Sequence, residues 1–102
     1  MIGLRFEWDE AKNRSNRRKH GVSFEEASQV FRDPLHLSTL DRVEDGEQRW
    51  RTIGSVGGCL ILVVAHTIVE EGIDRGFMEI IRIISARRAD RSERRRYENE
   101  ES

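Results

Sequence analysis

The second half of the chain is patterned with a period of two, and this alternation restricts the fold more than any other feature. Apolar and polar residues alternate in four segments: LHLSTL, QRWRTIGSV, CLILVVAHTIV and FMEIIRIIS. Successive side chains of a β-strand point to opposite faces of a sheet, so the pattern predicts four strands. Turns at Asp45-Gly46, at Gly57-Gly58 and within Glu71–Gly76 join them, which favours an antiparallel meander. The run Leu60–Val64 is apolar on both faces and predicts the central strand.

The N-terminal part predicts a strand followed by an unusually polar helix. The segment LRFEW alternates, which indicates a short first strand over Leu4–Trp8. Asp9 then has the position of an N-cap, and Gly21 stops the helix after His20. Ala11 is the only apolar residue in this helix, so buried side chains contribute little to holding it. Charge pairs, the helix ends or a charged partner must hold it instead.

Two further helices complete the prediction. Ser23 and Glu26 form a capping box at the start of the helix SFEEASQVFRD, and Asp33-Pro34 ends it. A last helix runs from about Ala89 to Glu98. The order β-α-α-β-β-β-β-α predicts an α+β domain: an antiparallel four- to five-stranded sheet packed by two N-terminal helices and one C-terminal helix.

Length and charge restrict the classes of function. The chain has 102 residues and reads as one domain over 1–102, with a polar tail at 98–102. Charged residues make up 36% of it, yet the formal net charge is only -1, so no global field attracts polyanions. The basic residues are clustered in Lys12–Lys19 and Arg82–Arg96, and most are arginines, whose planar fork suits phosphate oxygens. Any affinity for nucleic acid must therefore be local.

The sequence gives no support for a reactive cysteine, a metal site or a membrane span. The single cysteine, Cys59, lies in an apolar run and is expected to be buried and inert. His20, His36 and His66 fall in separate predicted elements without zinc-site spacing, so we expect neither a metal nor another cofactor. No stretch has the length of a membrane span and no signal-peptide pattern opens the chain, so we expect a cytoplasmic protein that does not bind membranes.

The predicted third strand carries one candidate group. Glu47, Arg49 and Arg51 share one face by alternation, with Trp50 on the other. This face is either a solvated edge or part of a binding site. Trp50 is a candidate for stacking on a base.

The last predicted strand runs directly into arginines. Arg82 shares its face with two isoleucines, and burying an unpaired charge there is expensive. Arg82 therefore either pairs with a carboxylate such as Glu47 or points into a cleft that binds an anion. Arg87 and Arg88 follow at the junction with the last helix, where they could reach across the mouth of such a cleft.

His20 and Lys19, at the end of the first helix, also allow two interpretations. An imidazolium is stabilised by the helix dipole, so His20 either caps the helix or transfers protons. Lys19 is a solvated charge unless this helix lines the cleft. Together the arginines, Glu47 and His20 suit RNA cleavage without metal, which needs a base near the ribose 2′-OH, a donor near the 5′-oxygen and cations on the phosphorane.

Four motifs then point to a known family. They are W-D-x-x-K, N-x-x-K-H-G-V-x-F, an acidic-G-E-x-R turn, and R-I-I-S-A-R-x-A followed by E-x-x-x-Y. In this chain they are Trp8-Asp9 with Lys12, Asn16 with Lys19-His20-Gly21-Val22 and Phe24, Asp45-Gly46-Glu47 with Arg49, and Arg82 through Ala89 with Glu93 and Tyr97. Over almost its whole length the sequence resembles the BrnT family of toxins from type II toxin-antitoxin systems.

The resemblance implies a RelE-like ribonuclease fold and toxic RNA cleavage that blocks translation. It also implies neutralisation by a small BrnA-like antitoxin with a ribbon-helix-helix-type element, through which alone the toxin would reach operator DNA. The hypothesis for the site follows by residue. In this hypothesis Arg82 and Arg87 hold the scissile phosphate, and Arg49 stabilises the transition state. Either Glu47 or His20 moves the proton. RNA is contacted by Lys19, Trp50 and Arg88, and the antitoxin by Arg17 and Arg18. A non-enzymatic module that binds an acidic partner or DNA through the same arginines stays open as the alternative.

Overall fold

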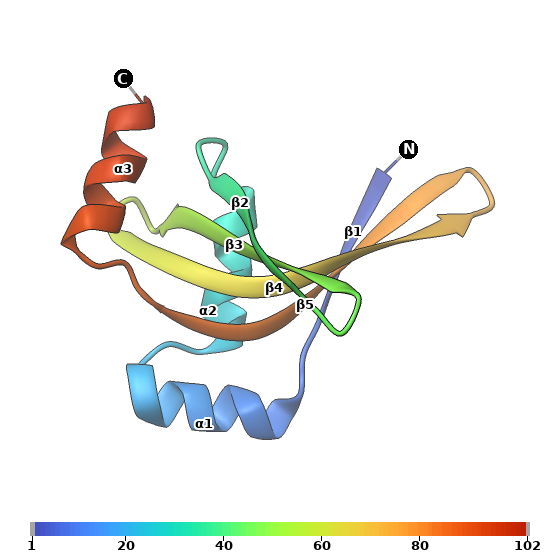
Figure 1. Cartoon of the computed structure of the whole chain (residues 1–102), viewed down its shortest axis with the longest axis horizontal. Helices are drawn as coiled ribbons and strands as arrows, with labels where there is room; N and C mark the ends of the chain where they lie inside the picture. The colour runs from blue at the N-terminus through green and yellow to red at the C-terminus, as the bar shows by residue number, and fades with distance from the viewer. Residues whose placement is uncertain (1, 102) are drawn as a thin grey trace.

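The structure is a computed structural model that describes residues 2–101, and it follows the predicted order of elements (Figure 1). The elements are β1 (Ile2–Glu7), α1 (Glu10–His20), α2 (Phe24–Ser28), a 3-10 helix (Gln29–Arg32), β2 (Leu37–Glu44), β3 (Glu47–Val56), β4 (Leu60–Ile73), β5 (Gly76–Arg88) and α3 (Arg91–Glu101). The second predicted helix is thus a short α-helix continued by a 3-10 turn. α3 extends through residues 98–101 of the predicted tail, while residue 102 lies outside the described residues.

The sheet is mixed, which corrects the antiparallel prediction. Its strands follow the order β1-β5-β4-β3-β2, so β4 is central, as the apolar run Leu60–Val64 predicted. β2 to β5 form the expected antiparallel meander, but β1 pairs in parallel with β5. The alternation of a strand identifies its two faces and not its neighbour, so the partner of β1 was invisible in the sequence.

The arrangement of the helices differs from the prediction that all three pack on the sheet in the same way, which is a second correction. α2 and the 3-10 helix pack on one face of the sheet, α1 runs beside β5, and α3 lies on the other face (Figure 1). The main core forms under α2 from Val22, Phe24, Ala27, Val30, Leu62, Val64, Ile81, Ile83 and Ala86. On the opposite face Tyr97 of α3 packs on Ile53 and Val63. Its hydroxyl donates a hydrogen bond of 2.5 Å to Asp33, which ties α3 to the segment before β2.

Two buried asparagines hold α1, which explains how a helix with one apolar residue is stable. The Asn16 amide donates to the carbonyls of Ala86 (2.8 Å) and Val22 (2.9 Å), and its oxygen accepts from the Ala86 N–H (3.1 Å). It thereby pairs with the β5 edge as a neighbouring strand would, beyond the end of β1. The Asn13 oxygen accepts from the Phe24 N–H at 2.8 Å and fixes the start of α2. The one apolar side chain of α1 stays exposed.

A β-bulge in β5 changes which residues share a face. Consecutive residues of β4 pair with Ser85 and Ile83, so Ile84 is the extra residue. Strict alternation would place Arg82 and Ile84 on one face. After the bulge, Ser85 and Arg87 join Arg82 instead.

Below the sheet surface lies a buried polar chain. His66 is fully buried, and its Nε2 lies 2.6 Å from the Thr52 hydroxyl, which lies 2.7 Å from the Ser38 hydroxyl. The ring of Phe31 packs edge-on at 4.9 Å. Burial lowers the pKa of His66 from 6.5 to about 4, so the imidazole is neutral at physiological pH.

Two further sequence predictions concern the burial of Cys59 and the presence of a membrane-spanning segment. Cys59 lies in the turn between β3 and β4 and is exposed, so its predicted burial is wrong; the strand begins one residue later, at Leu60. Among the described residues, no helix is both long and apolar enough to span a bilayer.

Replacing Asn16 should destabilise the fold strongly. Asn16→Ala leaves the Ala86 N–H and two carbonyls without partners in a dry interior, which should lower the free energy of unfolding by about 2–4 kcal/mol. Urea unfolding followed by circular dichroism measures this loss. Ser15→Ala, at the exposed neighbouring position, is the control and should change little. Equal stability of the two variants would contradict the role given to the amide.

His66 should make the stability depend on pH. The folded pKa is about 4 and the ordinary value is 6.5, so the unfolded chain binds a proton that the folded protein excludes. As the pH falls from about 6.5 to about 4, His66 should remove about 3 kcal/mol of the free energy of unfolding. Urea titrations across this interval measure the slope. His66→Gln should flatten it, and an unchanged slope in that variant would assign the dependence to other groups.

Candidate active site

Four arginine side chains of β3 and β5 share the sheet face that lies opposite α2. They are Arg49 and Arg51 of β3, and Arg82 and Arg87 of β5, and we call this surface the arginine face. Between the two strands β4 contributes small side chains, since Ala65 pairs with Arg51 and Thr67 pairs with Arg82. Long cations therefore surround a low floor, a shape that admits a phosphate group.

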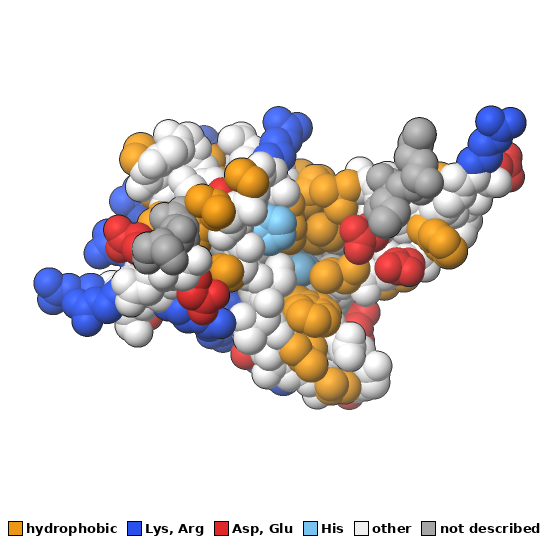
Figure 2. All heavy atoms as spheres, turned by 90° about the horizontal axis from the view of Figure 1, so that it is seen from above, with side chains coloured by type: hydrophobic (Ala, Val, Ile, Leu, Met, Phe, Trp, Pro, Cys, Tyr) orange, Lys and Arg blue, Asp and Glu red, His pale blue; other side chains and the backbone are white. Residues whose placement is uncertain are grey.

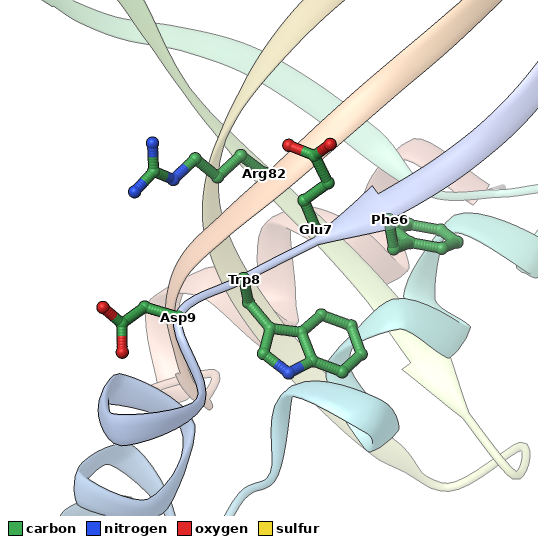
Figure 3. Close-up of a pocket in the computed structure, with 5 residues that line it drawn as sticks. All are labelled: Phe6, Glu7, Trp8, Asp9 and Arg82. Carbon is green, nitrogen blue, oxygen red and sulfur yellow. The ribbon is translucent and has the colours of Figure 1, made fainter.

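Arg82 lies between two open hollows. One, of about 570 Å³, is bordered by Glu7 and Asp9, and Figure 3 shows these carboxylates on the same side as the Arg82 guanidinium. Phe6 and Trp8 turn to the other side (Figure 3). Within residues 2–101 the Arg82 side chain forms no hydrogen bond or ion pair, and it is exposed. Of the two alternatives for Arg82, the structure shows the open cleft and not the paired charge.

Glu47 and Arg49 stand beside Arg82. Glu47 and Arg82 line the second hollow, of about 220 Å³, and Arg49 Nη2 lies 3.2 Å from Glu47 Oε1. Arg49 Nε is buried and has no hydrogen-bond partner within the described chain, and it lies 4.0 Å from Glu44 Oε2. Buried donors are normally satisfied, so this nitrogen without a partner is an exception on the arginine face. The structure thus brings together Glu47, Arg49 and Arg82.

Arg87 is on the same face but is already engaged. Its two terminal nitrogens donate to the Glu93 carboxylate at 2.7 and 2.9 Å. This bidentate pair lowers the pKa of Glu93 to about 2 and raises the pKa of Arg87. Glu93 also caps α3, because Asp90 and Glu93 exchange side-chain to backbone hydrogen bonds. Arg87 therefore links β5 to the start of α3 at one end of the arginine face.

Lys19 and His20 approach from the edge of the sheet. They line a hollow of about 200 Å³ together with Ile84 and Ser85 of the β5 bulge. Asn16 produces this placement by fixing α1 to the backbone of Ala86. Ser85 belongs to the arginine face, so Lys19 and His20 meet this face at the bulge. They line a different hollow from Glu47 and Arg82.

The other predicted site residues lie elsewhere. Trp50 is half-buried on the opposite sheet face, where it pairs with His66. Arg88 pairs with the core residue Leu62, so alternation directs it away from Arg87. Arg17 and Arg18 are exposed on α1.

Glu7 is a site residue that sequence reasoning missed. Its neighbour in the parallel pair of strands is Arg82, it borders both hollows, and Arg5 holds its carboxylate at 3.1 Å. The alternation of LRFEW already placed Arg5 and Glu7 on one face. That signal could not reveal that this face continues the arginine face, because the partner of the strand was unknown.

The described residues include no cluster of side chains suited to bind a metal ion. Residues 2–101 contain no group of three or more His, Cys, Asp or Glu side chains placed to hold a metal ion. The positive charge of the site is supplied by arginines.

Comparison with known proteins places this arrangement in a family. Residues 8–93 match the model of the ribonuclease toxin BrnT of type II toxin-antitoxin systems. Among solved structures, the ribonuclease toxin BrnT of Brucella abortus, determined at 1.1 Å, has a similar fold, with a TM-score of 0.54 and 23% sequence identity. The match covers 89% of this chain and 99% of that one. Comparison with curated protein sequences gives no match.

The α+β fold with its arginine-lined sheet is therefore that of a ribonuclease toxin. The chain belongs to the BrnT family, because the family model covers most of its length. This confirms the family that the four sequence motifs indicated, and it confirms a toxin of a type II toxin-antitoxin system.

The ion pair between Arg87 and Glu93 should contribute measurable stability. Glu93→Gln removes the charge and should lower the free energy of unfolding by about 1.5–3 kcal/mol at neutral pH. The folded pKa of Glu93 is depressed from 4.5 to about 2, so its contribution is complete above about 4.5 and is lost as the pH falls towards 2. Urea unfolding of both proteins over this range measures the difference. Glu98→Gln, exposed on the same helix, is the control. A constant difference between wild type and Glu93→Gln would contradict this linkage.

Proposed function

We propose that this toxin is a metal-independent endoribonuclease whose active site is the arginine face. The observation that carries the proposal is Arg82, an exposed and unpaired guanidinium between Glu7 and Glu47, with the unsatisfied Nε of Arg49 nearby. Isolated surface arginines usually find carboxylate partners or face bulk water. Here Arg82 borders two hollows, and the small side chains of Ala65 and Thr67 on β4 leave a low floor beside it, which supports binding of a phosphodiester.

The proposed reaction is transfer of the phosphorus from the 5′-oxygen to the 2′-oxygen. The ribose 2′-oxygen attacks the adjacent phosphorus while a base takes its proton, and the bond from phosphorus to the 5′-oxygen breaks. The leaving oxygen receives a proton, so the products end in a 2′,3′-cyclic phosphate and a 5′-hydroxyl. Negative charge grows on the phosphorane oxygens, where fixed guanidinium groups stabilise it.

Arg82 is assigned to the phosphate because its guanidinium is exposed and has no described partner. Arg49, which stands beside Glu47 on the same face, is assigned to the charge that grows in the transition state. Arg87 contributes its charge from the end of the face, while Glu93 fixes its position. Glu47 is assigned as the proton acceptor, because it lines the same hollow as Arg82. His20 lies in the neighbouring hollow with Lys19, where it can meet the continuing RNA strand or take part in proton transfer to the leaving group.

The biological context follows from the family. We propose that RNA cleavage inhibits translation in the cytoplasm and that a BrnA-like antitoxin of the ribbon-helix-helix type neutralises the toxin and carries the complex to operator DNA. Arg17 and Arg18 are exposed on α1, which is compatible with their predicted contact with the antitoxin. The alternative, an interaction module without turnover, would use the same arginines to bind an acidic surface.

Purified toxin, freed of antitoxin, should cleave RNA in the presence of EDTA and leave 2′,3′-cyclic phosphate ends. Arg82→Ala should reduce the rate by about a hundred- to a thousandfold while leaving the unfolding transition unchanged, because a transition-state donor is lost from an exposed position. Arg32→Ala, which removes an exposed arginine from the 3-10 helix, is the matched control and should keep full activity. RNA left intact by the wild-type toxin would favour the non-enzymatic module. A folded Arg82→Ala variant with full activity would remove Arg82 from the mechanism.

A further inference from the structure

Part of the sheet face that carries α2 is not covered by any described element and is apolar. Six side chains form this surface, which we call the apolar face: Leu4, Leu40, Val43, Trp50, Ile68 and Phe77. Four of them are large hydrophobic residues that are between 44% and 60% exposed. Figure 2 shows hydrophobic side chains gathered in the middle of this side of the molecule, around a histidine. Exposed apolar areas of this kind commonly mark interaction sites.

The apolar face contains a shaped groove. A hollow of about 260 Å³ lies between Leu4 on one side and Phe31 on the other, with Ile68 and Ile81 as its apolar floor. Polar groups stand at its border: the hydroxyl of Ser38, the ring of His36 and the carboxylate of Glu79. Apolar walls with a few polar groups at the rim are suited to inserted side chains of a protein partner.

The charge at this surface is negative. Glu70 and Glu79 face the same side of β4 and β5 as Ile68 and Phe77, and Figure 2 shows carboxylates beside the hydrophobic area. On the described strands β1, β4 and β5, the one lysine or arginine that faces this side is Arg88, which pairs with Leu62 at the opposite end of β5 from Phe77. At the groove, RNA phosphates would meet Glu70 and Glu79 with no cation of β1, β4 or β5 beside them, so the nucleic acid belongs on the other face of the sheet.

A second copy of the toxin fits this surface poorly. A twofold dimer through the apolar face would place Glu70 and Glu79 of both protomers in one interface, with no complementary cation from β1, β4 or β5 beside them. The chain also offers no matching element within its described helices, because α1 has one apolar residue and the apolar anchor of α3, Tyr97, is already buried. The complementary occupant is a different protein that presents apolar side chains together with basic ones.

We infer that the antitoxin anchors on the apolar face through an amphipathic segment. Its apolar residues would fill the groove beside Leu4 and cover Phe77, and its lysines or arginines would pair with Glu70 and Glu79. The inference rests on the antitoxin partner that the type II family implies. The apolar face lies across the sheet from the arginine face, so this contact supplies affinity and leaves inhibition of the active site to another part of the antitoxin.

The test measures affinity for the antitoxin encoded with this toxin, using purified proteins in the absence of RNA. Two independent double variants address the surface: Leu4→Ser with Phe77→Ser, and Glu70→Lys with Glu79→Lys. Each should weaken binding at least about tenfold, since buried apolar area and complementary charge are both lost. Ile73→Ser is the matched control, because Ile73 is equally exposed on the same hairpin but follows the other face. It should leave the affinity unchanged.

Three further readouts separate this inference from the proposed function. RNA cleavage by the free toxin should be the same in both double variants as in wild type, so loss of antitoxin affinity is measured independently of activity. Unchanged affinity in both double variants, with loss on charge reversal at Arg17 and Arg18, would overturn the inference and place the anchor on α1. A free toxin that dimerises by sedimentation analysis, and that Leu4→Ser with Phe77→Ser converts to a monomer, would overturn it in favour of a second copy.

Discussion

The arrangement of the site depends on the pairing between the Asn16 amide and the backbone of Ala86. β1 ends before the last third of β5, which leaves the N–H and C=O groups of that edge without a strand partner. A primary amide carries a donor and an acceptor in the same relative positions as a peptide group, so one asparagine on a helix can take the place of a strand. The polar α1 is thereby held against the sheet without an apolar stripe, and Lys19 and His20 are brought to the bulge of β5.

The sheet separates two kinds of surface. One face carries four arginines of β3 and β5 around small residues of β4, and one of them, Arg82, is exposed and has no described partner. The other is covered in part by α2 and is otherwise apolar and acidic. Because a strand directs alternate side chains to opposite faces, the two surfaces share their strands but not their residues. The proposed RNA cleavage and the proposed antitoxin contact should therefore respond to different substitutions.

Within the arginine face, the charges differ in their freedom. Arg87 is fixed by Glu93, Arg51 lies 3.4 Å from Asp41, and Arg82 has no described partner. A guanidinium held by a bidentate carboxylate shapes the field of the site but offers few donors to a substrate. The unpaired arginine is the one with the most to gain from an incoming phosphate. Arg87 is thus held in an ion pair, whereas Arg82 is unpaired. This difference explains why similar arginines in the sequence have dissimilar roles in the proposed mechanism.

The sequence by itself determined the elements, the central position of β4 and the family, since each depends on local pattern: alternation, capping residues, turns and short motifs. It also grouped Glu47 with Arg49, because neighbours at a spacing of two share a face. Only the tertiary structure decided the parallel pairing of β1, which adds Glu7 to Arg82, and the bulge at Ile84, which makes Arg87 and not Arg88 the companion of Arg82. Strand partners and register shifts arise from contacts between distant segments, and no periodicity within one segment encodes them. For the same reason the amide of Asn16, an ordinary polar residue in the sequence, became the attachment of a helix only when the edge of β5 was placed beside it.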